Sequence, residues 1–208
     1  MIWRMRHRRL DKDVVLRCYD KTLVAYEQLK CLRHRNLPEV YDALQLSDGQ
    51  IVLEEFVEGV TVAQVLESGL YTWHGAKMVL QGVGTAVETL HGLGLVHRDI
   101  KPENVMIATD GTVKLLDLNA TRQIHPDKTV DTQILGTIGY ASPEQLGIAQ
   151  TDARTDIYAL GVLLNVMLTG EHPSKTLARG RAGKIVLRCT QIAPHSRYQT
   201  VRQLLEAL

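Results

Sequence analysis

Apolar residues recur along the chain with two different periods, and the change falls near residue 60. Before that point, short apolar runs are separated by polar residues, which is typical of strands. Strands are expected over 14–17, 40–46 and 50–57. The turn between the last two is Ser47-Asp48-Gly49, and one helix is expected over 23–32. Pro38 follows that helix and keeps the chain from continuing it, because proline restricts the residue before it.

After residue 60 the apolar residues follow helical spacing. In the longest such stretch they form one continuous face, made of Ala76, Val79, Leu80, Val83, Ala86, Val87 and Leu90. Helices are expected over 61–68, 74–93, 156–164, 185–192 and 201–208. A β-hairpin interrupts this pattern, because Asp110-Gly111 lies between the apolar runs 105–108 and 113–116. The two parts together predict an α+β fold.

The composition is that of an ordinary globular protein. With 208 residues, 45% of them apolar, the chain is long enough for one sizeable domain. Its net charge of +1 gives no argument for nucleic acid or a membrane as a partner. Its three cysteines follow no C-x-x-C pattern, which favours a reduced compartment and no structural zinc. No stretch approaches the roughly 20 apolar residues of a membrane-spanning helix. A cytoplasmic protein is therefore expected.

The first nine residues, Met1–Arg9, are rich in arginine, and no apolar run follows them. They therefore do not form a secretory signal. We expect a solvated terminus, with contact to acidic lipid or to a partner as the alternative.

One polar loop carries most of the candidate chemistry: His97-Arg98-Asp99-Ile100-Lys101-Pro102-Glu103-Asn104. It supplies an acid, a cation and a carboxamide, and a second acid, Asp117, follows at the end of a strand. The hairpin after the loop places Asn104 and Asp117 at the same end, because one enters it and the other leaves it. This is the set of groups that magnesium-assisted phosphoryl transfer needs.

The eight residues of this loop match the protein kinase motif H-R-D-x-K-P-x-N at every fixed position, so the chain resembles a protein kinase catalytic domain. The resemblance implies a two-lobed fold, with a truncated N-terminal lobe over 1–57 and a mainly helical lobe over 58–208. It implies ATP and Mg²⁺ as cofactors. Residue by residue, Asp99 would be the catalytic base, Lys101 would steady the transferred phosphate, and Asn104 and Asp117 would bind magnesium. The lysine and proline at 101 and 102 are the serine/threonine-kinase form.

Further segments resemble the same family. Asp117-Leu118-Asn119 stands where the family has D-F-G, and 136–144 is similar to G-T-x-x-Y-x-A-P-E, with Ser142 in place of alanine. By this resemblance Thr137 would bond toward Asp99 and Lys101, and Asp156 would hold the backbone of the catalytic loop. Arg98 suggests control by phosphorylation of the segment 120–135, in which Thr129 and Thr132 are candidates. Glu144 and Arg197 would form a structural ion pair.

The part before residue 60 departs from the family. It contains no G-x-G-x-x-G, Arg17 stands at the strand lysine, and Ala25 stands at the helix glutamate. Arginine keeps the charge but not the geometry of an ammonium group. Either Lys21 replaces the strand lysine or Glu27 turns inward, and a mis-assigned start codon is the simplest alternative. By the same resemblance, residues 55–57 would form the hinge against the adenine. The residues expected to bind the nucleotide are Arg17, Glu55, Val57 and Asp117.

Three functions compete. The first is an ATP- and Mg²⁺-dependent serine/threonine kinase acting on a Ser or Thr hydroxyl of a protein. The second is a pseudokinase that serves as a binding or scaffold module, because the Gly-rich loop and the helix glutamate are missing. The third is a small-molecule phosphotransferase, which shares H-x-D-x-x-x-x-N but does not explain Ser142-Pro143-Glu144 with Arg197. The kinase is favoured, because a module without turnover has no need for Asp99, Lys101, Asn104 and Asp117 together. The protein substrate and the oligomeric state stay open.

Overall fold

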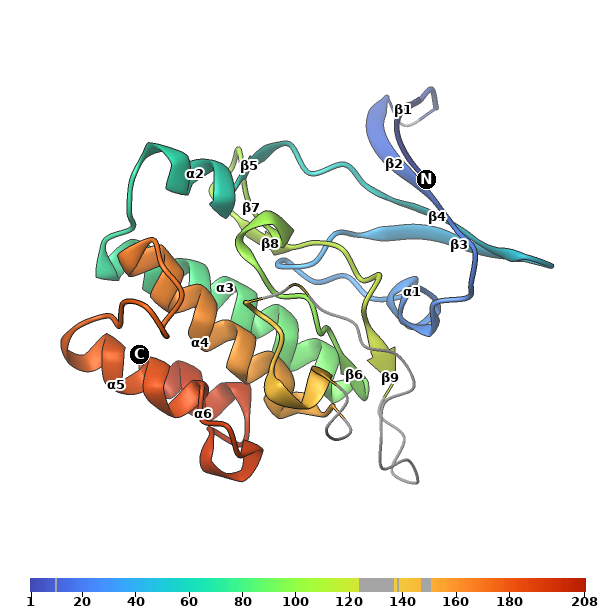
Figure 1. The fold of residues 1–208 in the computed structure, drawn as a ribbon. Coiled ribbons are helices and arrows are strands. Elements are labelled where there is room, and N and C mark those ends of the chain that lie inside the picture. Colours follow the sequence, from blue (N-terminus) through green and yellow to red (C-terminus); the bar gives the residue numbers. More distant parts are fainter. Residues whose placement is uncertain (10, 124–136, 138, 147–150) are drawn as a thin grey trace.

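The computed structural model describes residues 1–208 apart from 10, 124–136, 138 and 147–150. Its N-terminal part is an antiparallel sheet with the strand order β1-β2-β4-β3. The strands are β1 (Ile2–His7), β2 (Lys12–Tyr19), β3 (Val40–Leu46) and β4 (Gly49–Glu55). A single short helix, α1 (Val24–Leu29), connects β2 to β3 and packs against β3 (Figure 1).

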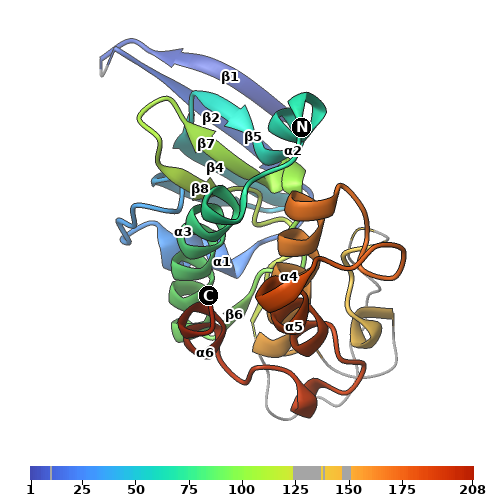
Figure 2. The same cartoon turned by 90° about the vertical axis from the view of Figure 1, so that its left-hand side faces the viewer.

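The C-terminal part is mainly helical. Its helices are α2 (Val62–Ser68), α3 (Trp73–Gly92), α4 (Ala153–Thr169), α5 (Gly180–Cys189) and α6 (Val201–Glu206). The helix α3 runs through the middle of this part and contacts both α4 and α6, while α5 packs on α4. Seen from two directions, the sheet β1–β4 lies at one end of the molecule and the helices α3–α6 at the other (Figures 1 and 2).

Short strands and turns lie between the sheet and the helices. They are β5 (Gly59–Thr61), β6 (Leu95–Val96), β7 (Val105–Ala108), β8 (Val113–Leu115), β9 (Arg122–Gln123), and the 3₁₀ turns η1 (Pro102–Asn104), η2 (Pro143–Leu146) and η3 (Pro194–Ser196). The strands β5, β7 and β8 form one small sheet in that order, and β6 pairs with β9. The polar loop 97–104 therefore begins at the end of β6 and runs directly into the hairpin β7–β8.

One hydrophobic core connects the two parts. Its buried side chains include Val52 from β4, Leu80 from α3 and Leu160 from α4, each with no exposed surface. Asn36 also joins the parts through hydrogen bonds. Its Nδ2 donates to Val113 O (2.7 Å), its Oδ1 accepts from Thr85 Oγ1 (2.9 Å), and its carbonyl accepts from Leu115 N (2.9 Å). Asn36 thus ties the chain leaving α1 to both α3 and β8.

Most of the predicted elements are confirmed. The hairpin is confirmed as β7 and β8, and the long helix as α3 with the predicted apolar face buried. The helix expected over 23–32 is shorter, since it ends at Leu29 and Leu32 N bonds back to Leu29 O in a tighter turn. The helix expected over 156–164 is longer, because Asp152 caps it at one end and Gly170, at φ 76°, ends it at the other.

The segment Met1–Arg9 is mostly exposed, as expected of a solvated terminus, but part of it is an ordered strand. Residues 2–7 form the edge strand β1, which pairs along its whole length with β2. The reason is charge pairing across the strands: Arg4 and Arg6 both bond the carboxylate of Asp13. Arg4 also stacks over the ring of Phe56, 4.2 Å from its centroid. Arg4 and Arg6 are therefore part of the sheet.

Candidate active site

One buried carboxylate of α4 anchors the start of the loop 97–104. Asp156, in the first turn of α4, has no exposed surface. It accepts hydrogen bonds from His97 N (2.9 Å), Arg98 N (2.8 Å) and His91 Nε2 (2.8 Å). Burial would raise the pKa of Asp156, but these donors outweigh it and the pKa lies below its ordinary value. The predicted anchoring of the loop by Asp156 is confirmed, and His91 has a structural role.

The backbone of the loop is unusual at Arg98, whose φ is 71°. A residue with a side chain adopts this left-handed conformation at a cost of about 1 kcal/mol or more. The turn allows the N–H groups of His97 and Arg98 to point at the same carboxylate. Gln145 supports the turn from the other side, because its Nε2 donates to Arg98 O (2.8 Å).

His97 connects the loop to the hairpin. Its ring is fully buried, and burial lowers its pKa, which favours the neutral form. Asp99 N donates to Nδ1 (3.3 Å) and Nε2 lies 3.2 Å from Leu116 O. The acceptor role of Nδ1 places the ring proton on Nε2. The ring therefore fixes the spacing between Asp99 and the end of the hairpin.

Three side chains hold the carboxylate of Asp99. Thr137 donates its hydroxyl to Oδ1 (2.6 Å), while Lys101 Nζ and Asn104 Nδ2 both lie 2.9 Å from Oδ2. Lys101 Nζ also donates to the oxygen of Thr137 (2.7 Å). Burial would raise the pKa of Asp99, but the bonds from Thr137, Lys101 and Asn104 outweigh it and lower the pKa. The predicted residues Asp99, Lys101, Asn104 and Thr137 therefore form one hydrogen-bonded cluster.

Asn104 and Asp117 lie at the same end of the hairpin, as predicted. The first residue pair of the hairpin is Val105 with Leu115, and just outside it Leu116 N donates to Asn104 O (2.7 Å). Asn104 Nδ2 donates to Asp99, which leaves Oδ1 of the same amide to bind a ligand. Asp117 has a φ of 63°, which turns the chain sharply at the end of the hairpin. The two oxygen-bearing side chains thus leave the hairpin together.

Arg17 lies between two carboxylates. Its Nε is 2.5 Å from Glu54 Oε1, and its Nη1 is 3.7 Å from Asp117 Oδ1. Burial would lower the pKa of Arg17, but the carboxylate of Glu54 outweighs it and raises the pKa. Arg17 therefore brings a permanent positive charge to the end of the hairpin at which Asn104 and Asp117 lie.

The helix α1 gives Arg17 no carboxylate. Ala25 is buried in the core, and the exposed Glu27 accepts a hydrogen bond from Gln50 Nε2 (3.1 Å). The alternative in which Glu27 turns inward is therefore wrong. Gln50 holds Glu27 because it also accepts from Leu23 N (3.0 Å), at the start of the helix.

The comparison with known proteins decides the family. A model of the protein kinase domain matches residues 8–206. The chain belongs to the protein kinase family. It is similar to the serine/threonine-protein kinase PknL of Mycobacterium tuberculosis, with 38% identity over 180 residues that make up 79% of this chain and 45% of that protein. It is also similar to the probable serine/threonine-protein kinase PknB of Corynebacterium glutamicum, with 35% identity over 68% of this chain and 23% of that protein. The chain thus spans less than half the length of these relatives.

Within this kinase domain, Asp99 lines a pocket of about 370 Å³. The pocket is lined by Tyr19, Asp20, Lys21, Asp99, Asn119, Ala120 and Thr137. Lys21 thus lies at the same pocket as the predicted base, although it is in the segment between β2 and α1. The sequence alternative in which Lys21 contributes a cation to the site fits this position.

The predicted hinge of the kinase domain follows directly after β4. The carboxylate of Glu55 binds Lys114 Nζ (2.8 Å) and accepts from Glu39 N (3.0 Å). Val57 is buried. The side chain of Glu55 is therefore engaged within the protein, and its N–H donates to Glu39 O (2.8 Å), which leaves the other backbone groups of 55–57 for a nucleotide base.

The predicted ion pair of Glu144 with Arg197 is confirmed. Arg197 binds Glu144 through two parallel bonds, Nη1 to Oε1 (2.7 Å) and Nη2 to Oε2 (2.9 Å). Both side chains are almost fully buried, and Thr155 adds a bond to Glu144 Oε1 (3.0 Å). The predicted phosphorylation sites Thr129 and Thr132 lie outside the described residues.

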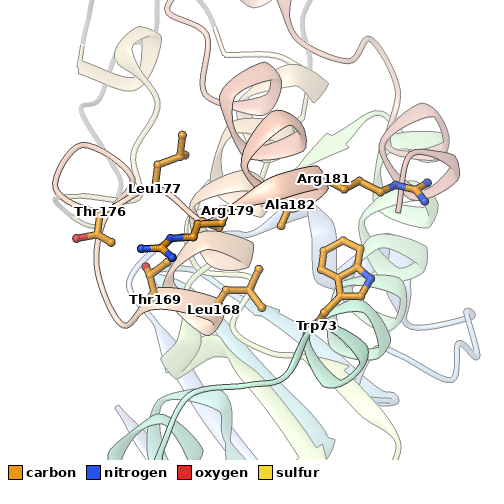
Figure 3. Close-up of a pocket in the computed structure, with 9 residues that line it drawn as sticks. Trp73, Leu168, Thr169, Thr176, Leu177, Arg179, Arg181 and Ala182 are labelled. Carbon is orange, nitrogen blue, oxygen red and sulfur yellow. The ribbon is translucent and has the colours of Figure 1, made fainter.

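A larger pocket, of about 520 Å³, lies on the helical part at the start of α3, the end of α4 and the start of α5 (Figure 3). Trp73 lines it from α3, Leu168 from α4, Ala182 from the first turn of α5, and Arg179 from the position just before α5. It shares no residue with the pocket at Asp99. It is therefore separate from the candidate active site.

Sequence reasoning missed Glu54, and an available signal pointed to it. Along β4 the residues Gln50, Val52 and Glu54 alternate on the buried face. A carboxylate at the third of these positions needs a cation beside it, since an unpaired buried charge is strongly unfavourable.

No helix among the described residues is both long and apolar enough to cross a lipid bilayer.

Proposed function

We propose that this domain is an active serine/threonine protein kinase, which transfers the γ-phosphoryl group of ATP to a Ser or Thr hydroxyl of a protein. The observation that carries the proposal is the assembled cluster around Asp99. Lys101 and Asn104 from the loop, and Thr137 from a position 38 residues further along the chain, converge on one carboxylate. A fold kept only for binding has no physical reason to hold this carboxylate in place.

The proposed chemistry begins at Asp99. Its carboxylate accepts the proton of the attacking hydroxyl as that oxygen bonds to the γ-phosphorus and the bond to the leaving ADP oxygen breaks. A lowered pKa keeps Asp99 ionised at neutral pH, so it is ready to accept a proton. Lys101 lies 2.9 Å from it and balances the charge of the transferred group. Thr137 orients Asp99 and, with Lys101, shapes the place for the substrate hydroxyl.

The donor set at the end of the hairpin fits magnesium. Asn104 Oδ1 and the carboxylate of Asp117 are hard oxygen ligands, which Mg²⁺ prefers, and both leave the hairpin at the same end. Bound there, magnesium would neutralise charge on the phosphates. The chain's own contribution is to hold Asn104 beside Asp99, through the bond from Asn104 Nδ2 to Asp99 O (2.8 Å), and to bring Asp117 to the same end of the hairpin.

The nucleotide would lie between the sheet and the hairpin. Arg17, 3.7 Å from Asp117, would bind phosphate oxygens, and Lys21 would add a second cation at the Asp99 pocket. The backbone of Glu55 to Val57 would contact the adenine. These cations would hold the phosphates and offset their charge, since positioning and electrostatics dominate phosphoryl transfer.

A pseudokinase remains the second candidate, and one observation favours it. The guanidinium of Arg17 is bonded to Glu54, so its charge is partly compensated before any nucleotide binds. If that pair is too tight to engage phosphate, the domain would keep its fold and bind partners without turnover.

Transfer of label from γ-labelled ATP to a generic Ser/Thr-containing basic protein tests the proposal. The product is hydrolysed to identify the phosphorylated amino acid. We expect phosphoserine or phosphothreonine that forms only with Mg²⁺. No transfer, together with no Mg²⁺-dependent increase in melting temperature on adding ATP, would contradict the kinase and support the pseudokinase. Phosphotransfer to small amines or sugars but not to protein would support a small-molecule phosphotransferase instead.

A further inference from the structure

The strand register brings Arg17 and Glu54 together. On the antiparallel pair β2–β4, Arg17 lies opposite Val52, and Glu54 lies opposite Val15. Residues two apart on a strand share a face, so Arg17 and Glu54 are diagonal neighbours on one face of the sheet. Two hydrogen-bonded strands set their spacing, which does not depend on any loop.

The contact between them is close and largely removed from water. Nε of Arg17 lies 2.5 Å from Oε1 of Glu54, and the two side chains are 12% and 7% exposed. A buried charge is retained only when it is paired, because loss of hydration is costly on both sides. Arg17 and Glu54 can therefore each remain charged at this buried position only because the other is there.

The geometry leaves the other end of the guanidinium for a different partner. Glu54 engages Nε, whereas Nη1 points to Asp117, at 3.7 Å. That distance exceeds a hydrogen bond but places the guanidinium next to the proposed magnesium ligand. Arg17 thus bridges from a fixed anchor to the place where the phosphates would lie.

The helix α1 contributes packing to this pair in place of charge. Tyr26, fully buried, stacks on Tyr19 with ring centroids 5.5 Å apart, and their hydroxyls are 2.7 Å apart. Both rings lie near enough to the Arg17–Glu54 pair for its charges to affect their hydroxyl pKa values, although burial is the main cause that raises them. The two rings shield the pair from water, while the charge that pairs with Arg17 comes from Glu54 on β4.

We infer that Glu54 is the positioning residue for the phosphate-binding cation Arg17, and that it acts from the neighbouring strand in place of a helix glutamate. In protein kinases the cation on the strand is generally oriented by a glutamate of the adjacent helix, and moving that helix breaks the pair. Here both partners belong to one sheet. The charge pairing of the cation therefore needs no carboxylate from α1, and the ligand it is positioned for is the phosphate chain of a nucleoside triphosphate. This inference rests on the proposed kinase function.

Steady-state kinetics of four variants test the inference. Glu54→Gln removes the anchoring charge but keeps the size, and Glu27→Gln is the matched control, because it removes the only glutamate of α1 without touching Arg17. We expect Glu54→Gln to raise the KM for ATP roughly tenfold or more, as expected for a lost charged hydrogen bond, with a smaller effect on kcat. Glu27→Gln should leave both constants as in the wild type.

The other two variants separate positioning from stability. Arg17→Glu places two carboxylates side by side and should lower the melting temperature. The double variant Arg17→Glu/Glu54→Arg restores an opposite-charge pair and should recover most of that loss. It should not recover ATP use, because the residue next to Asp117 is then an anion.

The outcomes distinguish this inference from the kinase proposal. A wild type that transfers phosphate, with Glu54→Gln unchanged in its KM for ATP, would overturn the role of Glu54 and leave the kinase intact. The same holds if Glu54→Gln lowers only the melting temperature, since the pair would then be purely structural. A wild type that neither binds ATP nor transfers phosphate would overturn the kinase proposal first, and the inference with it.

Discussion

The hydroxyl of Thr137 donates to Asp99 Oδ1 at 2.6 Å, although 38 residues separate the two in the chain. Thr137 Oγ1 in turn accepts from Lys101 Nζ at 2.7 Å. One hydroxyl thus connects the base to its neighbouring cation and ties residue 137 to the loop 97–104. Correct placement of Thr137 is therefore a condition for correct placement of Asp99.

Removal of this hydroxyl should reduce catalysis more than binding. We expect Thr137→Ala to lower kcat roughly tenfold to a hundredfold, because Asp99 loses a donor that fixes its orientation. Thr137→Ser keeps the hydroxyl and should stay within about threefold of the wild type. Steady-state rates at saturating ATP check this, and equal losses in the two variants would mean that the hydroxyl is not what matters.

The buried carboxylate of Asp156 should dominate the stability of the catalytic loop. Asp156→Asn would remove a charge that accepts from His97 N, Arg98 N and His91, and should lower the free energy of unfolding by about 3 kcal/mol. Asp152→Asn is the matched control four residues earlier. It keeps the helix cap at a more exposed site and should cost about 1 kcal/mol or less. Urea unfolding measures both, and similar losses in the two variants would contradict the anchoring role.

The pH dependence follows from the lowered pKa values of Asp99, Glu144 and Asp156. A carboxyl group whose pKa is lower in the folded than in the unfolded state stabilises the fold above its unfolded pKa. That stability is lost as pH falls through the folded value. We therefore expect the melting temperature to fall steeply below about pH 4. For the same reason the ionisation of Asp99 should not limit kcat/KM between about pH 5 and 8. The assignment would be contradicted if the pH profile of kcat/KM showed an apparent pKa in that window and this pKa were absent from the residual activity of Asp99→Asn.

The dependence on magnesium should change at Asp117 more selectively than at Asn104. Asp117→Asn keeps the shape but weakens one hard ligand, so the free Mg²⁺ needed for half-maximal rate should rise roughly tenfold or more. Asn104→Ala removes a ligand and also a donor to Asp99, so kcat should fall even at saturating Mg²⁺. Rates measured against free Mg²⁺ separate the two effects. An unchanged Mg²⁺ requirement in Asp117→Asn would remove it from the metal site.

The catalytic loop could be predicted from the sequence because its geometry is local. Asp99 and Asn104 are five residues apart in one loop, and the hairpin that brings Asn104 near Asp117 has its own turn signal at Asp110-Gly111. The long helix was equally clear, since its apolar face repeats over twenty residues. In these segments the local pattern and the tertiary contacts agree.

The pair of Arg17 with Glu54 could not be predicted in the same way. Its partners are 37 residues apart, and they meet only through the register between β2 and β4, which no single-strand pattern specifies. The strand β1 was missed for a related reason. Its arginines give it the composition of a solvated segment, and they are accommodated only because Asp13 lies across from them on β2.

The most direct test of the whole account is the rate of phosphoryl transfer from MgATP to a protein hydroxyl, compared between the wild type and Asp99→Asn. The variant keeps the size and most of the hydrogen bonds of the site but loses the base. The account predicts measurable transfer by the wild type and a reduction of roughly a hundredfold or more in the variant, with ATP still bound. Equal rates in the two proteins, or no transfer by a wild type that binds MgATP, would contradict it.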